Sequence, residues 1–297
     1  MIFFNNYNEL LRKTKLSFAD IGASGDLPPR LINFKKFLKI FSFEPNYDEY
    51  QKLKKKFKQK NLKIKIYNNA LGAKDQIRKL YITNGPFQTS FLKPNLSLVN
   101  KYANSKRFEI NKTVEVNCKK LDNLNENFDI IKVDTQGFNY EVLQGAKSKL
   151  KNILAIEIEA EFIQIYTNQK LFEDTKKYLE AKNFIFVDFL NMRRWTNYGY
   201  EFFGDLIFTN ALFIKNPNNI KINKKINYKK LLFICLLYNK LNFVKNLSKY
   251  LSQNEKIAVK KIILKKKILF LIPKILNSIL LKINRIFNKN LDISFYT

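Results

Sequence analysis

Carboxylates are the residues of this sequence best placed to move protons, because none of its 297 residues is histidine. Histidine is the commonest general base and the commonest metal ligand, so acid–base chemistry here must use carboxylates, lysine or tyrosine. Asp134 directly follows the apolar stretch FDIIKV and is the first candidate for a catalytic base. Glu159 is the second; it lies two residues beyond Glu157 and therefore on the same face of a strand. Glu157 itself is expected to be a solvated charge, and no metal site is predicted.

Two glycines in the stretch FADIGASGDLPPR, residues 18–30, form the next candidate feature, in a chain with only 8 glycines. Glycine adopts positive φ and lets another molecule approach the backbone closely. Gly22 and Gly25, after a strand and before a helix, would therefore form a cradle for a nucleoside. Glu44 follows 22 residues after Gly22, close to the spacing of about 20 expected of an acid that binds ribose hydroxyls.

The glycine turn lacks the full Gly-x-Gly-x-x-Gly pattern that a pyrophosphate needs for close approach. The turn therefore favours a ligand with a ribose but no phosphate, and S-adenosylmethionine is the common one. An NAD site and a purely structural turn are the two alternatives.

Short apolar runs alternate with amphipathic segments along the first 215 residues, which is the pattern of an α/β sheet. The predicted strands are 16–21, 40–43, 63–67, 78–83, 114–118, 128–133, 153–158, 184–189 and 203–208, with the last two paired. The predicted helices are one capped by Asp26 that reaches Leu38, then 46–59, 138–146 and 171–182. In such a sheet the ligand crevice lies beyond the carboxyl ends of the strands.

The charge is concentrated towards the C-terminal end of the chain. The formal net charge is +29, and residues 216–297 hold 18 Lys and Arg against only Glu255 and Asp292. Such a field attracts nucleic acids or membranes, although the Lys- and Asn-rich composition also fits an AT-rich genome. We predict a domain at 1–215 and a Lys-rich helical extension at 216–297, with a linker over 216–230.

Within the extension, residues 274–289 alternate basic and apolar residues in the pattern of a basic amphipathic helix. Such a helix could bind an anionic membrane surface, or its apolar face could pack against the main domain or a second subunit. No signal peptide and no apolar run of about 18 residues is found. Cys118 and Cys235 are expected to be reduced thiols. Together with the missing signal peptide and membrane span, they predict a cytoplasmic protein, which could be peripheral at the inner face of the membrane.

Seven segments in a fixed order carry a family resemblance over roughly residues 16–210: FADIGASGD, FSFEPN, NNALGAK, QTSF, DIIKVDTQGFNYEVLQGA, ILAIEIEAE and GDLIFTN. In these segments the chain resembles the FkbM-type family of S-adenosylmethionine-dependent methyltransferases. The resemblance implies a Rossmann-like class I methyltransferase sheet, mostly parallel with an antiparallel last strand and helices on both faces. Residues 1–215 would be this domain, followed by the basic helical tail.

The resemblance also implies roles for individual residues. Glu44 would hold the ribose, Asn69 to Leu71 would flank the adenine, and Asp134 would face the reaction centre. The cofactor-binding residues would be Asp20, Gly22, Ala23, Gly25, Glu44, Pro45, Asn69, Ala70 and Leu71. The residues predicted to contact the substrate are Gln88, Ser90 and Arg193.

The activity that the resemblance implies is O-methylation of a sugar hydroxyl in a glycan, glycolipid, polysaccharide or related metabolite. A hydroxyl must lose its proton when it is methylated, and a nearby carboxylate can take it. Alternatives stay open for the residues: Asp134 could only hold the cofactor or cap a helix, Gln88 and Ser90 could lie in a polar surface loop, and Arg193 in a β-turn.

Three other functions compete with this one. An RNA or DNA methyltransferase would fit the charge, but DTQG stands where base-amine methylases usually have Asn/Asp-Pro-Pro-Tyr/Phe, so nucleic acid is not expected as substrate. A membrane-surface protein dominated by the tail and an NAD-dependent oxidoreductase are the others. The oligomeric state is left open.

Overall fold

The computed structural model of the chain describes residues 15–32, 34–60, 62–197, 203–219 and 224–268, together with Leu271. Two compact units are present: residues 14–238 form one, and residues 1–13 with 239–297 form the other. The first unit extends beyond residue 215, where the sequence suggested a boundary, to Tyr238.

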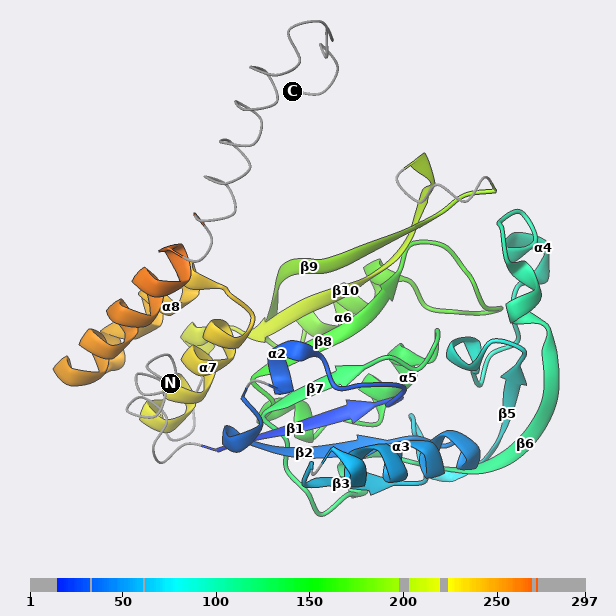
Figure 1. The fold of residues 1–297 in the computed structure, drawn as a ribbon, viewed down its shortest axis with the longest axis horizontal. Helices are drawn as coiled ribbons and strands as arrows, with labels where there is room; N and C mark the ends of the chain where they lie inside the picture. Colours follow the sequence, from blue (N-terminus) through cyan, green and yellow to red (C-terminus); the bar gives the residue numbers. More distant parts are fainter. Residues whose placement is uncertain are drawn as a thin grey trace, which may run out of the picture. The chain divides into compact units, whose positions relative to one another are not determined.

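A seven-stranded sheet forms the centre of the first unit, in the order β3-β2-β1-β7-β8-β10-β9 (Figure 1). Its strands are β1 (Leu16–Ile21), β2 (Leu38–Phe43), β3 (Ile64–Tyr67), β7 (Ile130–Val133), β8 (Ala155–Glu161), β9 (Phe184–Trp195) and β10 (Asp205–Lys215). The five strands from β3 to β8 are parallel, whereas β10, the last in the sequence, is antiparallel to both its neighbours. The predicted Rossmann-like class I methyltransferase sheet is confirmed.

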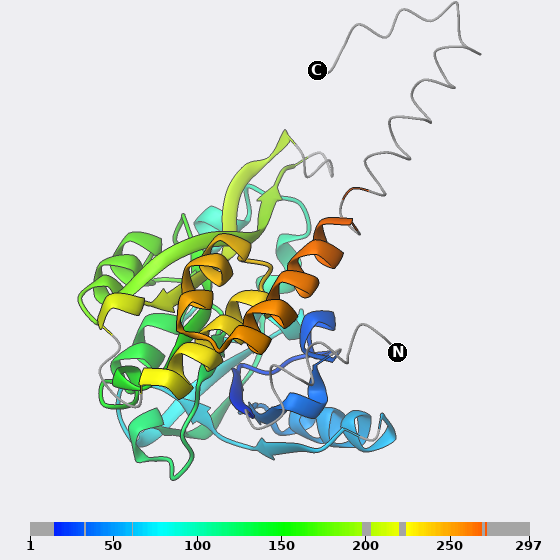
Figure 2. The same ribbon diagram turned by 90° about the vertical axis from the view of Figure 1, so that its left-hand side faces the viewer.

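Helices cover both faces of this sheet (Figures 1 and 2). They are α2 (Pro29–Ile32), α3 (Tyr47–Gln59), α5 (Asn139–Gln144), α6 (Phe172–Glu180) and α7 (Lys224–Leu237). Right-handed crossovers place the helices after β1 and β2 opposite those after β7 and β8, because the strand order reverses at β1. Accordingly, Tyr178 of α6 donates to the Leu143 carbonyl of α5, and Phe233 of α7 packs on Phe34, next to α2.

A small second sheet in the order β4-β6-β5 adjoins the main one. It consists of β4 (Ala70–Leu71), β5 (Gln76–Thr83) and β6 (Ile110–Lys119), and the last two form an antiparallel pair. The predicted strands at 78–83 and 114–118 are thus partners of each other. Short helices follow and connect these elements: η1 (Lys35–Phe37), η2 (Pro86–Gln88), α4 (Leu96–Val99), η3 (Ser105–Phe108), η4 (Leu121–Asn123), η5 (Lys149–Lys151) and η7 (Pro217–Asn219).

The helix predicted between Asp26 and Leu38 is wrong in its length. The α2 helix begins at Pro29 and covers four residues, and β2 already starts at Leu38, paired with Leu16 of β1. Asp26 caps no helix; its carboxylate pairs with Lys60 at 2.6 Å instead. Pairing of β2 along all of β1 takes Leu38 into the sheet, and the short helix η1 (Lys35–Phe37) precedes it.

The predicted linker over 216–230 is also wrong in its second half. Residues from Lys224 onward form α7, and Leu231 and Leu232 are fully buried. The Tyr228 hydroxyl donates to the Pro217 carbonyl. The lysine-rich composition of residues 216–230 suggested a solvated segment. The apolar residues in the second half of α7 are buried, however, and this helix therefore packs in the first unit.

The second unit contains α8 (Leu241–Leu247), η8 (Ser248–Tyr250) and helical residues at 253–268. The amphipathic helix predicted at 274–289 lies outside the described residues. In the described part of the chain, no helix has the length and apolar character needed to cross a membrane.

Candidate active site

A cleft of about 860 Å³, including its open mouth, lies at the carboxyl ends of β1, β2 and β7. This is the edge where parallel α/β sheets bind ligands. Its lining residues are Ile21, Gly22, Ser24, Phe43, Glu44, Pro45, Asn46, Glu49, Asn69, Ala70, Leu71, Leu80, Phe87, Thr89, Ser90, Phe91, Asp134, Thr135 and Gln136. The glycine turn, the acid after β2 and the DTQG segment therefore meet at one place, as the sequence predicted.

Gly22 lies in the cleft for a steric reason. Its φ is +79°, and a Cβ atom built on it would stand 1.9 Å from the Asp134 carbonyl oxygen, so no other residue fits there. Its amide donates to the Phe43 carbonyl at 3.0 Å, which joins the ends of β1 and β2. Gly25 also has φ +79°, but no atom lies within 4 Å of such a Cβ, so its need for glycine comes from the backbone conformation alone.

Six of the nine predicted cofactor residues line the cleft: Gly22, Glu44, Pro45, Asn69, Ala70 and Leu71. Asp20, Ala23 and Gly25 are not among the lining residues. Two lining residues carry buried polar atoms that have no hydrogen-bond partner among the described residues, the Asn69 side-chain nitrogen and the Thr89 hydroxyl. Buried polar groups are normally paired, so both are available to a bound molecule.

The Glu44 carboxyl is 7% exposed and accepts a hydrogen bond from the Asn46 amide at 2.7 Å. Burial raises the pKa of this carboxyl to about 8, against the opposing effect of that hydrogen bond. Loss of water disfavours the charged form of a carboxylate. Glu44 is thus a carboxyl that changes charge near neutral pH at the wall of the cleft.

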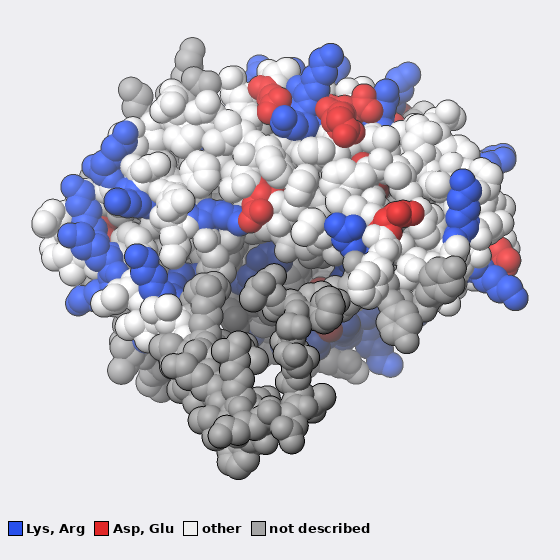
Figure 3. Space-filling view, turned by 90° about the horizontal axis from the view of Figure 1, so that it is seen from above, with Lys and Arg blue, Asp and Glu red and all other residues white. Residues whose placement is uncertain are grey.

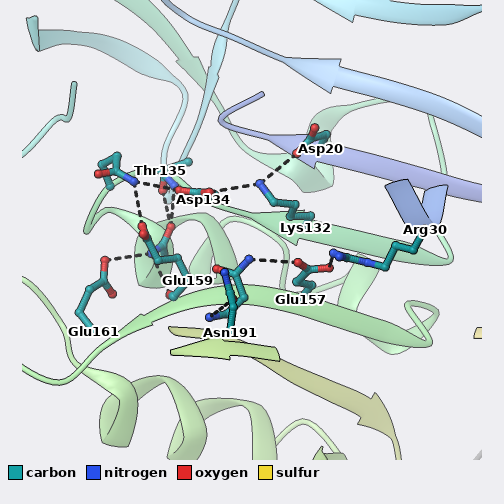
Figure 4. A network of polar contacts seen from close by, with 12 residues as sticks. Asp20, Arg30, Lys132, Asp134, Thr135, Glu157, Glu159, Glu161 and Asn191 are labelled. Atoms are coloured by element: carbon teal, nitrogen blue, oxygen red, sulfur yellow. Dashed lines mark hydrogen bonds and ion pairs between the residues drawn. The ribbon is translucent and has the colours of Figure 1, made fainter. Parts of the chain in front are cut away.

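A buried lysine holds two carboxylates at the floor of the cleft (Figure 4). Lys132 of β7 lies 3.2 Å from Asp134 and 3.4 Å from Asp20. Burial opposes ionisation of Asp134, but the Lys132 ammonium and hydrogen bonds outweigh it and lower the pKa of Asp134 below its ordinary value. Asp134 is therefore the ionised acid that faces the cleft.

Gln136 joins Asp134 to the acids of β8. Its side-chain nitrogen donates to Asp134 and to Glu159, in each case at 3.0 Å. The Tyr166 hydroxyl lies 3.1 Å from the Gln136 side-chain oxygen, which fixes the orientation of the amide. Gln136 has a left-handed backbone with φ +51°, followed by Gly137 with φ +84°, and this turn brings its side chain back across the end of the strand.

The two carboxyls that Gln136 connects have opposite pKa shifts. Burial, and then the negative charge of Asp134, raise the pKa of Glu159 well above its ordinary value. Burial also raises the pKa of Glu161, one step further along the same strand face, to about 8. The site therefore combines an acid with a lowered pKa, Asp134, with two acids whose pKa is raised, an arrangement in which acid and base are separated by environment.

The other predicted site residues take different places. Ser90 is buried, lines the cleft and donates to the Gln136 carbonyl at 2.6 Å. Gln88 and Glu159 are not lining residues. Arg193 lies within β9, opposite Phe208, rather than in a turn, and it is not a lining residue either.

The expectation that Glu157 is a solvated charge is wrong. Its side chain is 1% exposed and forms an ion pair with Arg30, as Figure 4 shows. It also accepts hydrogen bonds from Asn210 at 3.1 Å and Tyr238 at 2.8 Å. Its partners come from α2, β10 and the end of α7, which no local pattern could reveal.

Comparison with protein families identifies the chain. The model of the methyltransferase FkbM domain matches residues 28–186, more than half of the sequence. The chain belongs to the FkbM methyltransferase family. It is therefore a methyltransferase that uses S-adenosylmethionine, as the resemblance implied. A comparison with curated protein sequences finds no match.

Solved structures with distant similarity to the FkbM protein include other methyltransferases. Magnesium protoporphyrin IX methyltransferase from Synechocystis PCC 6803, solved with bound cofactor, has a TM-score of 0.39 and 9% identity, over 72% of this chain and 78% of that one. Precorrin-6y C5,15-methyltransferase from Geobacter metallireducens gives 0.36 and 11%, over 72% and 87%. A putative tRNA (m1A22) methyltransferase from Streptococcus pneumoniae gives 0.36 and 12%, over 86% and 97%. The fold assignment rests on the strand order and not on these low scores.

Two residues of the FkbM protein's site were missed from the sequence. Lys132 stands inside the apolar strand IIKV, and a lysine there is almost never buried unless it is paired, so its position was a usable signal. Gln136 belongs to the quoted DTQG segment, but nothing in the sequence pattern shows that its amide reaches Glu159. Among the described residues, no group of three or more His, Cys, Asp or Glu side chains could hold a metal ion.

Proposed function

We propose that this methyltransferase transfers a methyl group to a neutral sugar hydroxyl of a glycan, glycolipid or related metabolite. The observation that carries the proposal is the charge of the cleft. In a chain of net charge +29, no described lining residue is Lys or Arg, and Glu44, Glu49 and Asp134 are acids. Such a lining suits a cationic cofactor and a neutral acceptor, and it disfavours an anionic acceptor.

Bound S-adenosylmethionine supplies an electrophilic methyl group on a sulfonium. We assign its ribose hydroxyls to Glu44 and its adenine to Asn69, Ala70 and Leu71, on the strength of their positions in the cleft. The partnerless Asn69 amide supports this assignment, because a ligand would satisfy it. Gly22 also lines this part of the cleft, at the turn where the Asp134 carbonyl packs against it.

Asp134 is the proposed proton acceptor. The sulfonium of the bound cofactor would supply the methyl group and leave as a neutral thioether, and the Asp134 carboxylate would take the proton that the acceptor hydroxyl loses. A carboxylate with a lowered pKa is a sufficient base, because an oxygen that is being methylated becomes strongly acidic. Glu159, the second candidate, has a raised pKa, is not among the lining residues and accepts a hydrogen bond from Gln136; we assign it the role of holding Gln136 and Asp134 in place.

The acceptor side of the cleft mixes aromatic and polar groups. Phe87 is 58% exposed and lines the cleft near Thr89 and Gln136. An exposed aromatic face beside amide and hydroxyl groups suits a sugar ring, whose faces are apolar and whose edge is polar. Gln88, Ser90 and Arg193 stay predictions as substrate contacts.

Nucleic acid is the second candidate acceptor, because of the net charge. Basic side chains are spread over the face seen in Figure 3, with acidic ones among them, and no continuous basic stripe is visible there. A stripe or patch that leads to the active site is the usual electrostatic footprint of a nucleic-acid enzyme. The acidic lining of the cleft makes a neutral acceptor the better proposal.

An acceptor panel tests the substrate class. We would incubate the full chain with tritiated S-adenosylmethionine and neutral oligosaccharides, uronic-acid oligosaccharides or tRNA. The proposal expects label in a neutral oligosaccharide as an alkali-stable methyl ether. Label mainly in tRNA, or an alkali-labile methyl ester in the uronic acids, would contradict it.

The pH dependence of cofactor binding tests the role of Glu44 separately. Because its pKa is about 8 and the carboxylate is the form that accepts two ribose hydroxyls, affinity for S-adenosylhomocysteine should rise with pH, by up to about tenfold per unit below that pKa. Glu44→Gln should weaken binding at pH 8 at least about tenfold, or 1.4 kcal/mol, and flatten the profile. Calorimetric titration from pH 6 to 9 measures both.

The matched control for Glu44 is Glu180→Gln on α6, whose side chain is 49% exposed. It should leave the profile unchanged. A flat profile in the wild type, or equal affinity of Glu44→Gln, would remove Glu44 from the cofactor site while leaving the family assignment intact.

The cellular location also stays a proposal. Cys118 and Cys235 are buried and form no disulfide, which fits the reducing cytoplasm. We propose a cytoplasmic enzyme.

A further inference from the structure

The helical residues at 253–268, with Leu271, carry a row of exposed apolar side chains. Ile257, Leu264, Ile268 and Leu271 are 46%, 60%, 49% and 51% exposed. At about 3.6 residues per turn Ile257, Leu264 and Ile268 fall within about 40° of the helix circumference, and Leu271 is the next described exposed apolar residue. They form one continuous surface, which we call the apolar stripe.

The apolar stripe is not the face by which this helix packs in the protein. Ala258, Val259 and Ile262 are buried and lie on the opposite side of the helix. The helix therefore has two apolar sides, of which one is already covered. Contiguous apolar surface is uncommon on soluble proteins and marks an interaction site.

Lysines border the apolar stripe on both sides. Lys260 lies on one edge, on the side of Leu264, and Lys261 lies on the other edge, beside Ile268; both are exposed. Lys267, also exposed, continues the border on the first side. From residue 256 to residue 291 the sequence holds ten Lys or Arg and no Asp or Glu.

We propose that the apolar stripe is a docking surface for an anionic lipid bilayer, on which this helix lies in the plane of the interface. An apolar row with lysines on both edges is the arrangement of interfacial helices: the row enters the acyl boundary and the ammonium groups reach the headgroups. The absence of acids along the neighbouring sequence adds attraction to an anionic surface. This surface goes beyond the proposed methyl transfer and does not depend on it.

Two other occupants fit the apolar stripe less well. A protein partner would favour an interface whose core is depleted of lysine and rich in aromatic residues, whereas this row is aliphatic and closely bordered by lysines. A nucleic acid would use the lysines but would gain nothing from four aliphatic side chains. Only a lipid surface uses both features.

Vesicle binding by the full chain tests the proposal. We would sediment the protein with vesicles of phosphatidylcholine and phosphatidylglycerol, 3:1, and with pure phosphatidylcholine. The double variant Leu264→Glu with Ile268→Glu should need at least about tenfold more anionic lipid for half-binding, because acids replace groups that enter the bilayer. Lys260→Gln with Lys261→Gln should weaken binding several-fold at low salt and less at high salt.

The matched control is Ile77→Glu with Ile110→Glu, two exposed isoleucines of β5 and β6. It adds the same charge elsewhere and should weaken vesicle binding less than about threefold. Circular dichroism and S-adenosylhomocysteine binding check that each variant is folded. If the glutamate pair does not fold, Leu264→Gln with Ile268→Gln replaces it.

Four results would overturn the proposal. The stripe variant could sediment with anionic vesicles like the control, or the wild type could bind pure phosphatidylcholine as well as the anionic mixture. Light scattering could also show a dimer that the stripe variant dissociates while vesicle binding is absent, which would make the stripe a contact between two copies. Tighter binding of a short RNA than of vesicles, lost in the Lys260 and Lys261 variant alone, would also count against it.

Discussion

Glu157 and Glu159 are neighbours on one face of β8, yet their surroundings differ. Glu157 pairs with the Arg30 guanidinium and accepts hydrogen bonds from Asn210 and Tyr238. Glu159 is held by the Gln136 amide, and burial raises its pKa well above the ordinary value. One buried acid is balanced by a cation, whereas the raised pKa of the other favours its protonated form.

The difference separates a structural acid from one that belongs to the chemistry. A buried ion pair with all its hydrogen bonds made holds elements together, here α2, β8, β10 and α7, because removal of one partner leaves an unpaired charge. An acid with a raised pKa, Glu159, beside one with a lowered pKa, Asp134, suits the separation of acid and base at a reaction site. Two glutamates that stand two residues apart on one strand therefore have different roles.

The largest effect is expected at Asp134, the carboxylate that faces the cleft. Asp134→Asn removes the proton acceptor and should lower methyl transfer to the acceptor found by the panel about 10³-fold, within the range for general bases. Binding of S-adenosylhomocysteine should change less than about threefold. Initial rates with tritiated cofactor and calorimetric titration measure the two quantities.

Asp174→Asn on α6, a carboxylate 45% exposed, is the control for Asp134→Asn and should leave both quantities unchanged. If Asp134→Asn lost cofactor affinity in proportion to its rate, Asp134 would be a binding residue. The contrast with Glu157 would then be between an acid that holds the fold together and an acid that binds the cofactor.

The next effect is on stability and belongs to Glu157. Arg30→Met should lower the free energy of unfolding by about 3 kcal/mol, because it leaves a carboxylate that is 1% exposed without its cation. Urea unfolding of the full chain measures the change. Lys176→Met, in an exposed pair with Glu180, should give no measurable loss, since exposed ion pairs contribute little. Equal stability of the two variants would mean that the ion pair between Arg30 and Glu157 does not stabilise the fold.

The main features of the fold could be predicted from the sequence because they depend on local pattern. Apolar runs located the strands, and the glycines predicted a turn with close approach to the backbone, although the group that packs against Gly22 is the Asp134 carbonyl. The pattern failed at α7, where lysines suggested a linker although the apolar residues are buried. Burial of a helix depends on the surface that it meets, which composition does not describe.

The site was predictable only in its outline. Asp134 and Glu44 could be found because each follows a strand whose end lies at the cleft. The environment of Glu157 could not, because Arg30 and Tyr238 stand 127 and 81 residues away in the sequence. The network of Gln136 likewise depends on a left-handed backbone at a residue other than glycine, for which the sequence gives no sign.

The smallest effect is expected on the pH dependence of stability, and it tests the difference between Glu157 and Glu159 by a substitution of Glu159. Because the pKa of Glu159 is raised in the folded protein, the unfolded chain binds fewer protons above about pH 4.5, and Glu159 lowers stability as pH rises. Glu159→Gln removes this loss and keeps the shape. The variant should match the wild type near pH 5 and have a higher free energy of unfolding than the wild type at pH 8.

Glu157→Gln, the same substitution two residues earlier on β8, is the control for Glu159→Gln. It leaves the Arg30 guanidinium without its carboxylate, so the free energy of unfolding should fall at pH 5 and at pH 8 alike. Urea unfolding at both values, with both variants, gives four differences from the wild type. A gain at pH 8 for Glu159→Gln beside a loss for Glu157→Gln would establish that one acid is held by its proton and the other by its partner. Losses of equal size for the two variants at pH 8 would show that both acids are ionised in the folded protein, and the proposed division between them would fail.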